Sequence, residues 1–151
     1  LWGFDVSHLT SYLGTLQLHP EFFDVYLDLA VDFGLPLRLG GRSTERAIGF
    51  PFRRLAAEAG IVSPDHLVAP RTIGSRATLE AIVPQLRAGV TEVCLHPAVD
   101  TPELRDLTED WPARVDDHHL VTAGHELKAM LEKVGVALVG YRALRDLQRA
   151  G

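Results

Sequence analysis

The stretch Val-Thr-Glu-Val-Cys-Leu, residues Val90–Leu95, decides the fold because it is the clearest β-strand of the chain. Apolar and β-branched residues dominate it, Gly89 precedes it and His96–Pro97 follows it. An amphipathic helix is predicted before Gly89, with Ser75 capping its start and Pro84 kinking or shortening it. A helix that leads into a buried strand is half of a β–α–β unit, which is typical of a parallel sheet.

The same alternation of strands and helices runs through the rest of the chain. The apolar pattern predicts further strands at residues 4–9, 35–39, 66–69 and 136–139, and further helices at residues 20–33, 46–59, 127–134 and 141–149. One or two short helices are expected in the segment 97–117, which is rich in proline and aspartate. Four or five strands with flanking helices predict an α/β fold with a mostly parallel sheet.

The first predicted helix shows the pattern most clearly. Pro20 stands in its first turn, where the missing N–H costs nothing, and Gly34 ends it. Its apolar residues form a broad face and are Phe22, Phe23, Tyr26, Leu27, Leu29, Ala30 and Phe33.

The length of 151 residues predicts a single domain over residues 1–151. A closed barrel of eight β/α units typically needs ~250 residues, so the chain is expected to form an arc of such a barrel. An arc leaves two sheet edges open, which a second copy in a homo-oligomer or additional chain would cover. Because the sequence begins at Leu1 without a methionine, we expect an N-terminal portion to be absent from it.

Composition excludes several classes of protein. The net charge of −5 argues against a nucleic-acid partner, which selects a basic face. No apolar run approaches the ~20 residues that span a bilayer, so no membrane partner is expected. The single cysteine, Cys94, excludes an internal disulfide and a zinc site with paired cysteines. A reducing cytoplasm is the expected compartment.

His96 is the strongest candidate for chemistry, because sites in such folds lie at the carboxyl ends of strands. Pro97 favours an extended backbone at His96, and a histidine exchanges a proton near neutral pH, as a general acid must. A structural, hydrogen-bonded histidine is the alternative. Cys94 lies two residues earlier on the same side of the strand, so a Cys–His nucleophile pair is conceivable, although a small buried residue is favoured.

Three other histidines are candidates for a metal cluster. His118 and His119 are adjacent, and His125 follows them, but no carboxylate stands at a diagnostic spacing. Solvated histidines on a loop and at a helix start are the favoured interpretation. The arginines of the last helix (Arg142, Arg145 and Arg149) are interpreted as a solvated face.

Two segments together resemble the YdjC-like carbohydrate deacetylases. Residues 8–12 (His-Leu-Thr-Ser-Tyr), followed by a proline-initiated helix and a strand that ends at Arg38, are similar to the family's H-x-D-S-H region. The segment Thr91–Asp100, with its His-Pro pair and its following aspartate, looks like the second signature. Arg114 and Asp117 stand where the family often has an arginine and an acidic residue. The resemblance covers nearly all 151 residues.

The resemblance implies a portion of an irregular (β/α) barrel of the polysaccharide-deacetylase type. It implies hydrolysis of the acetamide of N-acetylated oligosaccharides, with a divalent metal, Mg²⁺ or Zn²⁺, activating a water. It assigns the general acid to His96, and the substrate or supporting contacts to Arg38, Asp100 and Arg114.

The metal site is expected to be incomplete in this chain. The family's Asp-Asp motif and an upstream histidine are not found in the sequence, and Thr10 replaces the aspartate of the first signature. Tyr12 stands at the position of a metal-binding histidine, and a tyrosine is neutral below a pKa of about 10. His8 is a weak candidate ligand that we expect to make a hydrogen bond instead. Two hypotheses stay open: a deacetylase completed by further residues, or a non-catalytic relative that binds sugar or forms a structural homo-oligomer.

Overall fold

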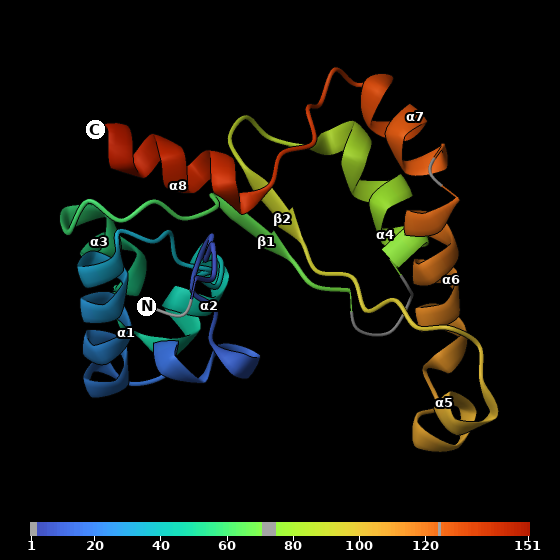
Figure 1. Ribbon diagram of the computed structural model, residues 1–151, viewed down its shortest axis with the longest axis horizontal. Coiled ribbons are helices and arrows are strands. Elements are labelled where there is room, and N and C mark those ends of the chain that lie inside the picture. Colours follow the sequence, from blue (N-terminus) through green and yellow to red (C-terminus); the bar gives the residue numbers. More distant parts are fainter. Residues whose placement is uncertain (1–2, 71–74, 124) are drawn as a thin grey trace. The chain divides into compact units, whose positions relative to one another are not determined.

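The computed structural model describes residues 3–70, 75–123 and 125–151, whose elements Figure 1 shows. In chain order they are the 3₁₀ helix η1 (Tyr12–Gln17), α1 (Pro20–Phe33), α2 (Arg42–Ile48), α3 (Phe52–Glu58), β1 (His66–Val68), α4 (Ser75–Ile82), the 3₁₀ helix η2 (Val83–Gln85), β2 (Thr91–Val93), α5 (Pro102–Leu107), α6 (Trp111–Thr122), α7 (Glu126–Glu132) and α8 (Tyr141–Ala150). They form two compact units: unit 1 combines Leu1–Leu67 with Val139–Gly151, and unit 2 is Val68–Leu138. The single domain over residues 1–151 stays a prediction.

The sheet is smaller than the sequence predicts, within a helix-rich α/β fold. β1 and β2 form a small parallel sheet, and beyond it the amide of Cys94 donates to the carbonyl of Val68 (2.9 Å). The strands predicted at 66–69 and 90–95 are therefore confirmed. The prediction of four or five strands is wrong for the described residues, which hold two strands and one isolated bridge.

The isolated bridge shows why the first two predicted strands stop short of a ladder. Leu9 and Leu37 form this single parallel bridge. The Leu9 amide donates to the carbonyl of Pro36 (2.9 Å), and the Arg38 amide donates to the carbonyl of Leu9 (3.0 Å). Pro36 has no N–H to extend the pairing on one side of the bridge. On the other side, the amide of Gly40 donates to the side chain of Gln17 (2.6 Å) instead of to a strand.

The strand predicted at residues 136–139 is also wrong. The amide of Val136 instead donates to the carbonyl of Leu131 (3.1 Å), after Gly135 turns the chain in the left-handed region at φ 68°. This arrangement closes the end of α7. Leu138 follows with 80% of its surface exposed, which a strand buried between helices does not allow.

α1 begins and ends where the sequence predicts. Pro20 is its first residue, and Gly34 adopts φ 58° and donates its amide back to the carbonyl of Val31 (3.2 Å). Only part of its apolar face is used in packing. Phe23, Tyr26 and Ala30 are buried, whereas the remaining apolar residues of the helix include the exposed Phe22, Val25, Leu29, Val31 and Phe33.

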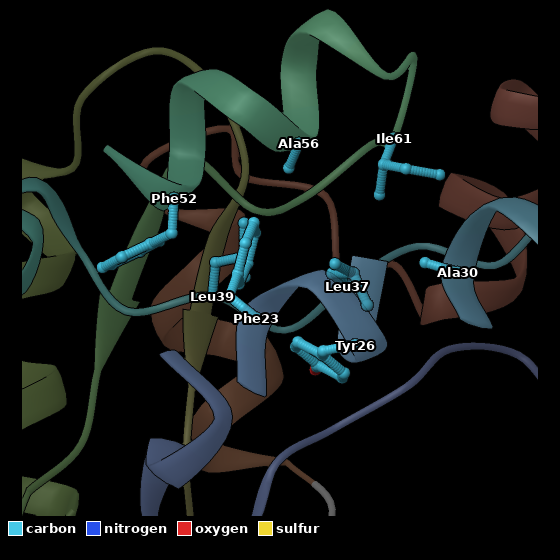
Figure 2. Packing of buried hydrophobic residues seen from close by; sticks show 8 residues of the cluster. All are labelled: Phe23, Tyr26, Ala30, Leu37, Leu39, Phe52, Ala56 and Ile61. Atoms are coloured by element: carbon cyan, nitrogen blue, oxygen red, sulfur yellow. The ribbon is translucent and has the colours of Figure 1, made fainter. Parts of the chain in front are cut away.

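The core of unit 1 forms where α1, α3 and the extended segment after α1 meet (Figure 2). Its buried members are Phe23, Tyr26, Ala30, Leu37, Leu39, Phe52, Ala56 and Ile61. Aromatic rings supply the centre: the ring of Phe23 lies 5.5 Å from that of Phe50 and 6.1 Å from that of Phe52. These are separations at which tilted and edge-on ring pairs attract each other.

The helix predicted over residues 46–59 is two helices in the structure. α2 ends at Ile48, where Gly49 takes a left-handed conformation at φ 75°. Pro51 then precedes the first residue of α3. A proline excludes helical geometry from the residue before it and lacks the amide that would continue the helix, so the break follows from these two residues.

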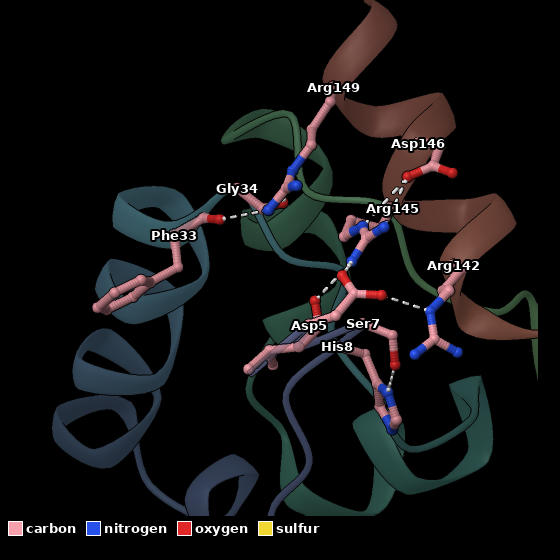
Figure 3. Close-up of polar contacts among 10 residues, drawn as sticks. Asp5, Ser7, His8, Phe33, Gly34, Arg142, Arg145, Asp146 and Arg149 are labelled. Atoms are coloured by element: carbon pink, nitrogen blue, oxygen red, sulfur yellow. Dashed lines mark hydrogen bonds and ion pairs between the residues drawn. The ribbon is translucent and has the colours of Figure 1, made fainter. Parts of the chain in front are cut away.

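α8 connects distant parts of unit 1 (Figure 3). Arg142 and Arg149 are exposed, as expected of a solvated face, whereas the expectation is wrong for Arg145. The side chain of Arg145 is buried and donates to the carboxylate of Asp5 and to the carbonyl of Val6 (2.9 Å). Arg149 donates to the carbonyls of Phe33 and Gly34 (3.1 Å each) at the carboxyl end of α1. A cation there satisfies carbonyls that the helix itself leaves without donors.

Asp5 gives a prediction about stability in acid. Two hydrogen bonds hold the pKa of the Asp5 carboxyl below its ordinary value, the larger effect coming from Arg142 and the smaller from Arg145. The stabilising contribution of Asp5 is therefore present above the unfolded-state pKa, about 3.9, and is lost as the pH falls through the folded-state pKa. We expect Asp5→Asn to lower the melting temperature at pH 7 and to lower it progressively less toward pH 2. An equal difference at both pH values, measured by circular dichroism, would show that the ion pairs do not stabilise the fold.

Unit 2 has a core of its own. Leu79 from α4, Val83 from η2, Leu120 from α6 and Leu131 from α7 are buried together, and Val93 of β2 packs against them. As predicted, the helix that begins at Ser75 is shortened before Pro84 and continues as η2. Among the described residues, no helix is both long and apolar enough to cross a bilayer.

Candidate functional site

The first group of candidate residues lies around the Leu9–Leu37 bridge in unit 1. The bridge holds the segments that carry His8, Thr10 and Arg38. The guanidinium of Arg38 donates to the hydroxyl of Thr10 (3.4 Å), so the structure brings these two predicted residues together. Thr10 is exposed and Arg38 is half-buried, which leaves both within reach of a ligand.

Two buried polar side chains beneath this group were not singled out by sequence reasoning. The hydroxyl of Tyr26 lies 2.8 Å from the carbonyl of Leu9 and 3.2 Å from that of Arg38. The Gln17 side chain donates to the carbonyl of Arg38 (3.4 Å) and accepts from the amide of Gly40 (2.6 Å). The signal for Gln17 was available, because it is a polar residue between two leucines. Both side chains fix the backbone from which Arg38 projects.

His8 makes the hydrogen bond expected of it. Its Nδ1 lies 3.0 Å from the hydroxyl of Ser7 (Figure 3), and its ring stacks on Tyr141 of α8 with the centroids 3.8 Å apart. Tyr12, at the position of the family's ligand, begins η1 and exposes 84% of its surface. His8 is therefore held by its neighbours, and Tyr12 points its phenol into solvent.

The described donors do not fit a divalent metal. Within residues 3–70, 75–123 and 125–151, no three or more His, Cys, Asp or Glu side chains converge as a possible metal site. A catalytic zinc site uses three protein ligands, and Mg²⁺ prefers carboxylate oxygens. His8 with the exposed phenol of Tyr12 supplies neither set.

The second group of candidates lies in unit 2, just beyond β2. His96 is exposed, yet its backbone is held: its amide donates to the Oδ2 of Asp117 on α6 (2.9 Å). The amide of Ala98 donates to the carbonyl of Arg114, also on α6 (3.0 Å). A ring that faces solvent on a fixed backbone can exchange a proton with a ligand. Cys94, two residues earlier, is half-buried.

Asp100 and Arg114 each carry an ion pair. Asp100 accepts two hydrogen bonds from Arg105 (2.8 and 2.7 Å), which hold the pKa of its carboxyl below the ordinary value. Arg114 donates to Asp110 (2.9 and 3.2 Å), and this contact raises the pKa of its guanidinium. Their roles toward a substrate stay predictions, and sequence reasoning did not identify either partner.

The three histidines considered for a metal cluster lie in α6 and just before α7. His118 and His119 lie inside α6, not on the expected loop, with ring centroids 6.0 Å apart, and His125 precedes α7. α6 starts at Trp111–Pro112, a favourable helix start, and therefore reaches both residues.

Comparisons with known proteins give a family match and a likeness in fold. A family model described as "YdjC-like protein" matches residues 1–133. Among solved structures, the chain is similar to a proposed cellobiose-phosphate cleavage protein of Enterococcus faecalis, with a TM-score of 0.74 and 22% sequence identity. That similarity covers 94% of this chain and 54% of the other, so this chain spans about half of its length. At this identity the likeness shows a shared fold. None of the curated proteins matches the sequence.

Proposed function

The chain belongs to the YdjC-like family, and from this we propose that it serves in removing acetyl groups from N-acetylated oligosaccharides. The family includes carbohydrate deacetylases and related cellobiose-phosphate cleavage proteins, and it is generally metal-dependent. The irregular (β/α) barrel is part of this proposal, and the likeness over 94% of the chain shows that the fold is shared with a solved structure.

The observation that carries the proposal is the state of His96. Hydrolysis of an acetamide adds water to the carbonyl and breaks the C–N bond, and the departing nitrogen must gain a proton. His96 combines an exposed imidazole with a backbone amide held 2.9 Å from a buried carboxylate. We assign it the role of proton donor to the amine. Arg38, Asp100 and Arg114 are proposed to contact or support the sugar.

His8 and Tyr12 do not fit a divalent metal. The metal ligands are therefore proposed to be residues other than those that the structure describes. We therefore derive no step through a metal in this chain. The exposed Tyr12 also favours a second candidate function, a non-catalytic sugar-binding or structural relative. A homo-oligomer that covers the sheet edges belongs to that second candidate.

Acetate release tests the proposal. The 151-residue chain, and the full product of its gene where that is longer, would be incubated with N-acetylglucosamine oligomers and Zn²⁺ or Mg²⁺. We expect equal amounts of acetate and free amine from the protein with a complete set of metal donors, and loss of both with a chelator. Glucosamine oligomers without acetyl groups are the control. Binding of the acetylated oligomers without any acetate would contradict deacetylation and support the second candidate.

A further inference from the structure

Asp117 joins three separate segments of unit 2 through one buried carboxylate. It exposes only 4% of its surface. Its Oδ1 accepts from the amide of Ser75 (3.1 Å), and its Oδ2 accepts from the Ser75 hydroxyl (2.8 Å) and from the amide of His96 (2.9 Å). Ser75 is the first residue of α4, 42 residues away in sequence, and His96 is 21 residues away. Burial of a charge is costly unless donors surround it, and these three donors meet that need.

The same helix holds the backbone on both sides of Pro97. Asp117 and Arg114 lie three residues apart on α6, and therefore on one face of it. Asp117 accepts from the amide before Pro97, and the Arg114 carbonyl accepts from the amide after it, at Ala98 (3.0 Å). Pro97 itself has no amide and has a fixed φ. The backbone of His96 is thus fixed by two hydrogen bonds and a ring, while its imidazole stays exposed.

We propose that Asp117 is the positioning residue for His96. Its Oδ2 fixes the His96 amide, and this contact sets the direction in which the imidazole leaves the backbone. The proposal rests on the proposed function, in which His96 gives a proton to the departing amine. Asp117 touches no reacting atom, so we expect it to act on turnover through His96 and not on sugar affinity. Displacing a proton donor by about 1 Å can lower the reaction rate strongly. A residue that holds the donor in place therefore affects kcat.

Two variants separate positioning from plain stability. Asp117→Ala removes the carboxylate that accepts from the amide of His96 and from the amide and hydroxyl of Ser75. Ser75→Ala is the matched control, because it removes one hydrogen bond from the same carboxylate and leaves the His96 contact in place. Asp117→Asn keeps the shape but has a single oxygen, so it can accept from the amide of His96 or from that of Ser75, but not from both. It serves if the alanine variant does not fold.

The first measurement needs no substrate. Hydrogen exchange of the His96 amide is followed by NMR in the 151-residue chain. We expect exchange to be roughly tenfold faster in Asp117→Ala and unchanged in Ser75→Ala, because only the first variant removes the acceptor. Unchanged exchange in Asp117→Ala would overturn the proposal, whatever the activity of the protein.

The second measurement uses acetate release by the active protein. We expect a roughly tenfold lower kcat in Asp117→Ala with KM within twofold, and both constants within twofold in Ser75→Ala. In Asp117→Asn, kcat should follow the exchange rate of the His96 amide and not that of the Ser75 amide. A kcat that falls without faster His96 exchange would overturn the proposal. Faster exchange together with no acetate from the wild-type protein would leave Asp117 as the support of His96 and refute the deacetylase function alone.

Discussion

Phe23→Ala is expected to destabilise unit 1 by about 3–5 kcal/mol, the cost of removing a buried aromatic ring from a packed core. Phe23 exposes none of its surface, and its ring contacts those of Tyr26, Phe50 and Phe52. No rearrangement of a single neighbour can fill the space, because three rings line it. A typical domain is stable by only 5–15 kcal/mol, so the variant should unfold at markedly lower urea concentration.

The adjacent residue supplies the control. Phe22 lies on the same helix and loses the same atoms on substitution, but it exposes 55% of its surface. Phe22→Ala should cost less than about 1 kcal/mol. Hydrogen exchange of the α1 amides, with circular dichroism in urea, measures both variants. Equal losses would mean that the inner face of α1 has been assigned incorrectly.

His96→Gln is expected to lower kcat for acetate release by about 10²- to 10⁴-fold, the contribution typical of a positioned general acid. Glutamine keeps a hydrogen-bonding side chain of similar reach but cannot deliver a proton. His125→Gln is the matched control, since His125 is also exposed and lies outside the group around His96. It should leave kcat within twofold of the wild-type value.

The choice of substrate makes this test specific to proton donation. 4-Nitrophenyl acetate releases a phenolate that leaves without needing a proton. We expect His96→Gln to slow the hydrolysis of this ester far less than the hydrolysis of the acetylated sugar. An equal loss on both substrates would show that His96 acts by another route, such as binding.

Local patterns predicted those elements whose signals lie within one segment. α1 has a proline at its start, a glycine at its end and apolar residues at helical spacing, and all three signals agree. β2 was predicted from six residues of which three remain in a strand. The pattern of 35–39 is equally apolar, but it forms a single bridge, because Pro36 lacks an amide and the amide of Gly40 is bound by Gln17. Hydrophobicity indicates where a strand can be buried, whereas pairing depends on which amides face a partner.

The place of His96 at a strand end was predictable from the sequence, whereas the contacts around it were not. The His96–Pro97 pair at a strand end is a local signal, and the structure holds it at that place. The contact between Asp117 and Ser75 joins residues 42 apart, and neither spacing nor composition encodes it. Arg145 was misjudged for the same reason, because its partner Asp5 lies 140 residues earlier. From sequence alone, a charged residue on a helix is predicted to face solvent unless its ion-pair partner in the fold is known.

The closure of unit 1 by α8 affects how the protein is made. A ribosome adds about 5–20 residues per second, so several seconds pass between the appearance of residue 67 and that of residue 141. Unit 2 is continuous in sequence and emerges during that interval, whereas Asp5 and the carboxyl end of α1 must wait for Arg145 and Arg149. Asp5 and α1 therefore leave the exit tunnel before the arginines that bind them have been synthesised. Unit 1 therefore acquires these contacts only after unit 2 has been synthesised, when α8 (Tyr141–Ala150) becomes available to bind Asp5 and the end of α1.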